Sequence, residues 1–203
     1  MKLTHIIPLL TIITSTAAYA APETFDFKDP KGINNAGFKL DAPLESINGS
    51  ASGISGTVVF DPANPSATTG KIIVAANTLT VPNPMQKGHM QSDKWLDVAT
   101  YPEITFEARS LANVKTEGNV TTADVTGTFT LHGVSKDITT PVKFTYLADK
   151  LGDRVPNAKG DLLVIRANFN INRGDFNIQK GQFEDKVSDE IDLNLSIAGA
   201  AAK

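Results

Sequence analysis

The chain has 203 residues but no cysteine, a single tryptophan and only three histidines. Without cysteine there can be no disulfide, no thiolate metal ligand, no cysteine nucleophile and no cysteine for lipoprotein attachment. Apart from His5, the histidines are His89 and His132, which lie in different segments and outside any zinc or nucleophile motif. The sequence therefore predicts no metal site, no cofactor and no catalytic residue, and we expect a protein that is not an enzyme.

An excess of one charge and a long hydrophobic run are also missing. The most apolar stretch, residues 3–13, is too short to span a bilayer. It lies between Lys2 and Ala18-Tyr19-Ala20, the pattern of a secretory signal peptide that is cleaved before Ala21. Loss of Lys2 would leave 18 basic against 22 acidic residues, a net charge of −4, which argues against a nucleic-acid partner or an anionic membrane surface.

These features predict two regions in the chain. Residues 1–20 form the signal peptide, and residues 21–203 form a single domain that is long enough to bury a core. Export without disulfides indicates a periplasmic or secreted bacterial protein, with no integral membrane segment after signal cleavage. The sequence leaves the oligomeric state open, with a homodimer among the alternatives.

Alternation with period two is the main structural signal. Residues 125–131 and 138–146 each alternate apolar side chains with threonine and other polar ones, and residues 132–137 supply a turn, so we predict a long β-hairpin. Similar alternation recurs around Phe38 and Phe106 and over residues 167–173 and 191–197. Ten Phe, three Tyr and one Trp are few for a solid sandwich core. We therefore predict an all-β fold, an antiparallel β-barrel of about eight strands, with a filled β-sandwich as the alternative.

Residues 82–98 interrupt the alternation. Pro84 fits the first turn of a helix, and Ser92 or Asp93 can cap a second turn. We expect one or two short helical turns near residues 84–97, crossing one end of the sheet. Trp95, with Met85 and Met90 nearby, would then gate or plug that end of the barrel.

Three segments carry recognisable motifs in a fixed order. They are residues 89–106 (HMQSDKWLDVATYPEITF), residues 127–136 (GTFTLHGVSK), and residues 171–176 (INRGDF) with 187–191 (VSDEI). Together they resemble the YceI-like polyisoprenoid-binding family. The resemblance implies a lipocalin-like antiparallel barrel that holds a long isoprenoid or other long-chain lipid in an apolar tunnel. One departure is that residues 31–41 contain no histidine, where the family usually has a His-Ser pair and a second histidine.

In such a barrel the apolar positions of each strand face one axis, and small residues such as Gly127, Thr140 and Ala167 leave space there. The predicted ligand-binding residues are Phe38, Leu40, Met90, Trp95, Phe106, Val125, Phe129, Leu131, Val142, Phe144, Phe169, Ile171 and Arg173. We expect the protein to bind a long-chain isoprenoid or similar apolar lipid, with transport or storage both open. The alternatives are a lipid- or small-ester-modifying enzyme and a β-sandwich interaction module without a ligand.

Arg173 is the one charged residue in this set. It shares the inward positions of residues 167–171, and Asp189 shares those of residues 191–197. If these strands are antiparallel neighbours, both side chains lie at the same end of the barrel. Because an inward charge needs a partner, we predict that Arg173 pairs with Asp189, and the alternative is that Arg173 contacts a lipid head group.

Overall fold

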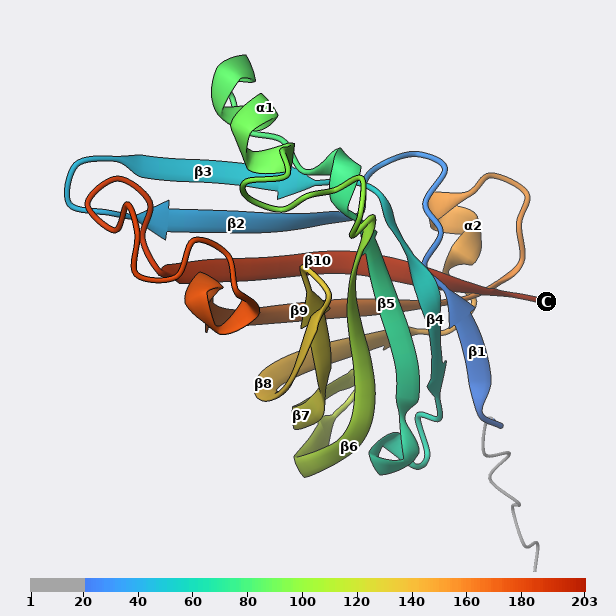
Figure 1. Cartoon of the computed structure of the whole chain (residues 1–203). Coiled ribbons are helices and arrows are strands. Elements are labelled where there is room, and N and C mark those ends of the chain that lie inside the picture. Colours follow the sequence, from blue (N-terminus) through green and yellow to red (C-terminus); the bar gives the residue numbers. More distant parts are fainter. Residues whose placement is uncertain (1–20) are drawn as a thin grey trace, which may run out of the picture.

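The computed structural model describes residues 21–203 (Figure 1). The predicted signal peptide, residues 1–20, lies outside the described residues. The strands are β1 (Glu23–Asp26), β2 (Asn35–Asp41), β3 (Ser46–Ala51), β4 (Ile54–Phe60), β5 (Thr69–Ala75), β6 (Glu103–Glu117), β7 (Val120–Leu131), β8 (Val134–Leu147), β9 (Gly160–Asn172) and β10 (Glu190–Ala202). The helical elements are α1 (Pro84–Gln91), α2 (Leu151–Arg154) and the 3-10 turns η1 (Pro65–Ala67), η2 (Ala76–Thr78) and η3 (Arg173–Phe176).

Eight of these strands form a closed antiparallel barrel. Their order is β1-β4-β5-β6-β7-β8-β9-β10, and β10 returns to β1 where Ala200 pairs with Asp26. Closure leaves every one of these strands with a neighbour on both sides, which removes the exposed edges that promote aggregation. The predicted lipocalin-like barrel is therefore confirmed, and the β-sandwich alternative is wrong.

The β2–β3 hairpin extends the barrel wall at one end. One edge of β10 pairs with β2 over residues 192–196 and then with β1 at Ala200. β3 reaches the other side of the barrel through Ser50, which exchanges two backbone hydrogen bonds with Thr80, 3.0 and 2.8 Å long. The hairpin lies above β10 in Figure 1, with its turn at the far left.

The central hairpin, β7–β8, has a shorter turn than predicted. Only His132 and Gly133 separate the two strands, and both have positive φ values of 51° and 70°, as a tight two-residue turn requires. A side chain on Gly133 would collide with the ring of Tyr101, which packs edge-on against His132. The strands extend through residues 134–137, and hydroxyl groups bond across the outer face there, as between Thr130 and Ser135 at 2.8 Å.

The predicted helical segment is present as α1, followed by turns up to residue 100. Its N-terminus depends on Asn83, whose side-chain oxygen accepts the N–H groups of Met85 (2.9 Å) and Gln86 (3.3 Å). Pro84 occupies the first helical position, where a missing N–H costs nothing. The segment crosses an end of the sheet near β3, as Figure 1 shows.

A cluster of buried aromatic side chains lies at the opposite end of the barrel. Phe25, Phe27 and Phe60 are completely or almost completely buried there. The ring of Phe60 stacks on that of Phe144, with ring centres 5.7 Å apart, and Phe25 meets the ring of Tyr146 edge-on. These aromatic rings fill the barrel at this end, which we call the closed end.

A polar cluster of Asp161, Tyr146, Lys203 and Glu23 also lies at the closed end. The buried Asp161 carboxylate accepts hydrogen bonds from the Tyr146 hydroxyl, the Asp149 N–H (2.8 Å) and the Lys203 ammonium (2.9 Å). Burial by itself would raise the pKa of Asp161, but these hydrogen bonds outweigh it and lower the pKa to about 2. Burial, followed by the charge of Asp161, raises the pKa of Glu23.

The closed end should make the stability of the protein depend on pH. Because the folded pKa of Asp161 lies below its ordinary value, its contribution is complete above about pH 4 and is lost as the pH falls towards 2. We expect Asp161→Asn to lower the free energy of unfolding at pH 7 by about 1–3 kcal/mol, since a charged acceptor is lost. Urea denaturation at several pH values should show this difference narrowing between pH 4 and 2.

A matched control exists within the same cluster. The raised pKa of Glu23 means that its charge opposes folding at neutral pH, so Glu23→Gln should leave the stability at pH 7 equal or higher. An effect of Asp161→Asn that stays constant from pH 7 to pH 2 would contradict this explanation.

Candidate ligand-binding cavity

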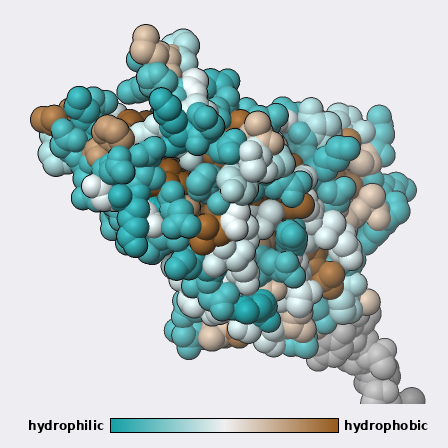
Figure 2. All heavy atoms as spheres, viewed as in Figure 1, coloured by the Kyte–Doolittle hydropathy of each residue, from teal (hydrophilic) through white to brown (hydrophobic). Residues whose placement is uncertain are grey.

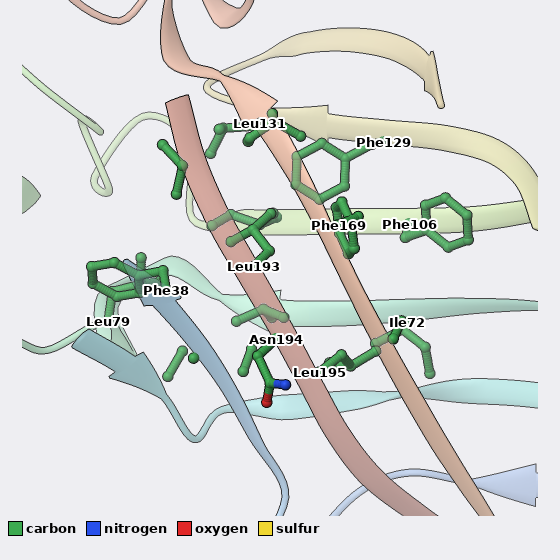
Figure 3. Close-up of a pocket in the computed structure, with 18 of the residues that line it drawn as sticks. Phe38, Ile72, Leu79, Phe106, Phe129, Leu131, Phe169, Leu193, Asn194 and Leu195 are labelled. Atoms are coloured by element: carbon green, nitrogen blue, oxygen red, sulfur yellow. The ribbon is translucent and has the colours of Figure 1, made fainter. Parts of the chain in front are cut away.

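An apolar cavity of about 420 Å³ lies inside the barrel, between the aromatic closed end and the segment that contains α1. This volume falls within the range of roughly 300–1,000 Å³ that is typical of small-molecule sites. Strands β2 to β10 all contribute side chains to its wall, because alternate residues of each strand point inward. The close-up in Figure 3 shows Phe38, Phe106, Phe129, Phe169 and Leu193 surrounding this space.

All of the residues predicted to bind the ligand lie in the wall of this one cavity. They are Phe38 and Leu40 of β2, Met90 of α1, Trp95, Phe106 of β6, Val125, Phe129 and Leu131 of β7, Val142 and Phe144 of β8, Phe169 and Ile171 of β9, and Arg173 of η3. The register explains this grouping, since Phe106 pairs with Phe129 and Phe169 pairs with Leu193 on neighbouring strands. Their role as ligand contacts stays a prediction.

Several wall residues lie outside the predicted set. Ile72 and Val74 of β5 and Leu193 and Leu195 of β10 face the cavity, as does Leu79 after η2. The alternation over residues 191–197 was a sufficient signal for the β10 pair. β5 gave no such signal, because apolar residues occupy both of its faces.

Small residues keep the middle of the cavity open, although one of them acts differently from the prediction. Ala167 and Thr140 line the cavity, as expected. A side chain at Gly127, however, would lie 2.5 Å from the carbonyl oxygen of Glu107 and 2.6 Å from the ring of Phe106. Gly127 therefore accommodates a neighbouring ring and does not create free space, and this part of the prediction is wrong.

We call the end of the cavity near Glu45, His89, Phe183 and Lys186 the mouth. Glu45, His89, Phe183 and Lys186 are exposed residues that also line the cavity, so the cavity opens to the surface between them. Deeper in, the polar wall residues include the hydroxyl groups of Thr68 and Thr140, both buried. Within residues 21–203, His and acidic side chains form no group of three or more that could hold a metal ion. This arrangement suits an apolar molecule whose polar end lies near the mouth.

Trp95 lies at the mouth, where it contacts two different groups. Its ring is 6.1 Å from that of Phe183, centre to centre, and the guanidinium carbon of Arg173 lies 5.8 Å from the centre of the indole. A cation at this distance is attracted to the face of an indole. Trp95 therefore joins the cavity wall to residues 177–188, which we call the Arg173 loop.

Arg173 is 1% exposed, and its side chain organises this loop. Its Nε donates to the carbonyl of Ser188 (3.1 Å), and its two terminal nitrogens donate to the carbonyls of Ile178 (2.8 Å), Gln179, Gln182 and Val187 (3.0 Å). A guanidinium group has five N–H donors, so every donor of Arg173 is used. The loop backbone therefore closes around one side chain.

The predicted ion pair between Arg173 and Asp189 is wrong. The two residues do lie opposite each other at one end of the barrel, and the Arg173 N–H donates to the Asp189 carbonyl at 2.8 Å. However, the Asp189 carboxylate accepts the N–H of Gly174 at 2.8 Å, and the guanidinium group bonds only to backbone carbonyls among the described residues. Backbone carbonyls thus satisfy the buried charge that was expected to need an acid.

A closed antiparallel barrel with an apolar cavity that opens at one end defines the lipocalin-like class of proteins. The model of the YceI-like domain matches residues 31–199 of the chain. The chain therefore belongs to the YceI-like family. It is 30% identical over 149 residues to Protein YceI of Salmonella arizonae and to that of Salmonella agona, which covers 73% of this chain and 71% of each relative.

Solved structures share this fold at lower sequence identity. BcnA of Burkholderia cenocepacia has a TM-score of 0.62 at 22% identity and covers 81% of this chain and 94% of its own. A polyisoprenoid binding domain from Saccharophagus degradans has a TM-score of 0.62 at 15% identity and covers 89% of this chain and 99% of its own. The YCEI protein of Campylobacter jejuni has a TM-score of 0.60 at 24% identity and covers 76% of this chain and 85% of its own. Separately, none of the helices in residues 21–203 has the length and apolarity to cross a membrane.

Proposed function

We propose that this protein binds a long-chain isoprenoid or a similar apolar lipid in the cavity, as a carrier or a store and not as an enzyme. The observation that carries the proposal is the cavity itself, an apolar space along the barrel that opens at one charged and aromatic end. Membership of the YceI-like family and the fold shared with a polyisoprenoid binding domain support a binding role.

Burial of the chain would supply most of the affinity. An isoprene unit has five carbons, and each buried carbon contributes about 0.8 kcal/mol, so one unit contributes about 4 kcal/mol before ordering costs. Several units in the cavity would bind tightly without a specific polar contact. Selectivity would then follow from the length and width of the cavity, which the rings of Phe38, Phe129 and Phe169 set.

In this function Arg173 would hold the mouth in shape and would not bind a lipid head group. A head group could hydrogen-bond to its guanidinium only by replacing one of five existing carbonyl partners. We therefore assign Arg173 the task of holding the Arg173 loop over the cavity, where Ile178, Phe183 and Val187 complete the wall.

The proposal includes the place of the protein in the cell. A signal peptide at residues 1–20 would direct a single domain, residues 21–203, to the periplasm or the medium, where an apolar lipid needs a carrier between membranes. A homodimer stays among the predicted assemblies.

The single tryptophan offers a direct test of binding. Trp95 lines the mouth, so a long-chain polyprenol that enters the cavity should change the tryptophan emission in a saturable way. A five-carbon prenol at the same concentration should cause little change in the emission. Each isoprene unit that it lacks removes about 4 kcal/mol of binding free energy. Unchanged emission, together with no polyprenol retained after gel filtration, would contradict the proposed function.

A further inference from the structure

The mouth carries three exposed large apolar side chains, of which only Phe183 lines the cavity. Leu44 in the β2–β3 turn is 69% exposed, Met85 in α1 is 71% exposed, and Phe183 in the Arg173 loop is 55% exposed. Leu44 and Met85 lie outside the cavity wall, whereas their neighbours Glu45 and Gln86 lie in it. The Leu44 N–H also donates to the Asp185 carbonyl at 2.9 Å, which ties the β2–β3 turn to the loop that bears Phe183.

These side chains project around one opening from three different segments. Figure 2 shows brown and tan spheres among teal ones on the upper and left parts of the molecule, where Figure 1 places α1, the β2–β3 turn and the loop before β10. Exposure of a large apolar side chain to water is unfavourable. Several such side chains around one opening therefore indicate an interaction site.

The charges of the same segments indicate which kind of partner fits. Residues 42–45, 84–95 and 177–188 contain Lys87, Lys94, Lys180 and Lys186 against Glu45, Asp93, Glu184 and Asp185. Equal numbers of each sign give no net attraction to an anionic or a cationic surface. A specific protein interface buries about 1,000 Å² or more of well-packed surface, whereas these segments present single apolar side chains separated by charged ones.

We propose that the mouth docks on the surface of a lipid bilayer, with Leu44, Met85 and Phe183 inserted at the boundary between head groups and acyl chains. Single apolar side chains among balanced charges fit this boundary, which accepts apolar groups a few ångströms below polar head groups. Docking would align the cavity with the membrane, so that a lipid moves between them without crossing water. This inference rests on the proposed function, because it assigns the mouth as the exit for the same ligand.

The test uses vesicles of phosphatidylcholine and two double variants of the purified protein. Leu44→Ser with Met85→Ser should weaken sedimentation with the vesicles by at least about tenfold, since two large apolar groups are lost. Ile33→Ser with Val155→Ser is the matched control, because these exposed side chains (58% and 40%) lie near Asn34 and α2, away from the mouth. The control should bind the vesicles like wild type. Binding of wild type to the vesicles should change little when phosphatidylglycerol is added or when the salt concentration is raised to screen surface charges.

The outcomes separate this inference from the proposed function. Both double variants should keep the lipid content of wild type after purification, because none of the four residues lines the cavity. If the wild-type protein carries lipid but does not bind vesicles, the docking inference is wrong and the proposed function is unaffected. An equal loss in both double variants, or binding that requires anionic lipid, would also overturn the docking inference. Wild type that binds vesicles but neither carries nor takes up an apolar lipid would support docking and reject the carrier function.

Discussion

Arg173→Met is expected to lower the free energy of unfolding by about 3–5 kcal/mol, because several buried or partly buried acceptors lose a charged donor and a buried acceptor left unsatisfied costs about 1–3 kcal/mol. The substitution keeps most of the side-chain volume but removes five donors and leaves the backbone carbonyls of Ile178, Gln179, Gln182, Val187 and Ser188 without their partner. The Arg173 loop should then open, and the cavity should lose the wall that Phe183 and Val187 supply. Urea denaturation measures the first effect, and the rate at which bound lipid is lost measures the second.

Two variants make this prediction specific to the hydrogen bonds. Arg173→Lys keeps the charge but has only three donors, so its stability should lie between those of wild type and Arg173→Met. Lys186→Met removes an exposed cation from the same loop and should change the stability by less than about 0.5 kcal/mol. If Arg173→Met instead releases the lipid while the stability stays at the wild-type value, Arg173 binds a head group and the structural assignment is wrong.

Ala167→Phe is expected to obstruct the middle of the cavity and to weaken binding of a long-chain isoprenoid by at least about a hundredfold. Ala167 faces the cavity from β9, between Val142 of β8 and Leu195 of β10. An added ring would exclude at least one isoprene unit, worth about 4 kcal/mol, and each 1.4 kcal/mol is a factor of about ten in affinity. The fold should persist, because the ring enters open space and not a filled core. Titration with polyprenols of different length measures the effect.

Two further variants complete this experiment. Phe129→Trp enlarges a ring in the cavity wall and should also shift the preference towards shorter chains. Asn170→Phe adds the same ring to β9 but on the exposed outer face, so it should bind every chain length like wild type. Equal affinities of Ala167→Phe and wild type for long chains would place the ligand outside the barrel.

The wall of the cavity could be predicted because strands have a strict period of two. Once one inward residue such as Phe129 is known, the pattern assigns Val125 and Leu131 to the same side, and a closed barrel brings the sides together. The helical segment at α1 was also predictable, since Pro84 and the preceding Asn83 form a local helix start. The alternation within each strand and the start of the helix both depend on interactions within a few residues.

The partners of Arg173 could not be predicted, because they depend on the backbone path of a loop. Asn177, Gln179 and Phe183 adopt positive φ values of 59°, 46° and 58°, which fold the loop so that its carbonyls converge on one point. The spacing of apolar residues in the sequence contains no information about such a backbone path. The position of β3 was equally hidden, since its bridge from Ser50 to Thr80 joins segments 30 residues apart through backbone atoms alone.

The role of Gly127 shows a further limit of sequence patterns. An inward glycine can mark free space or a neighbour that occupies the space, and the sequence does not distinguish the two. The ring of Phe106 on the adjacent strand takes the place of the missing side chain. A prediction of cavity volume therefore needs the register of neighbouring strands as well as the inward set of each strand.

Native mass spectrometry of protein purified without detergent or organic solvent tests the central claim most directly, namely that the barrel cavity holds a long apolar lipid. We expect a population whose mass exceeds that of the polypeptide by one long-chain lipid, and this excess should disappear on denaturation. We also expect that protein stripped of lipid regains such a mass when offered a long-chain polyprenol. Polypeptide mass alone in both samples would contradict the account.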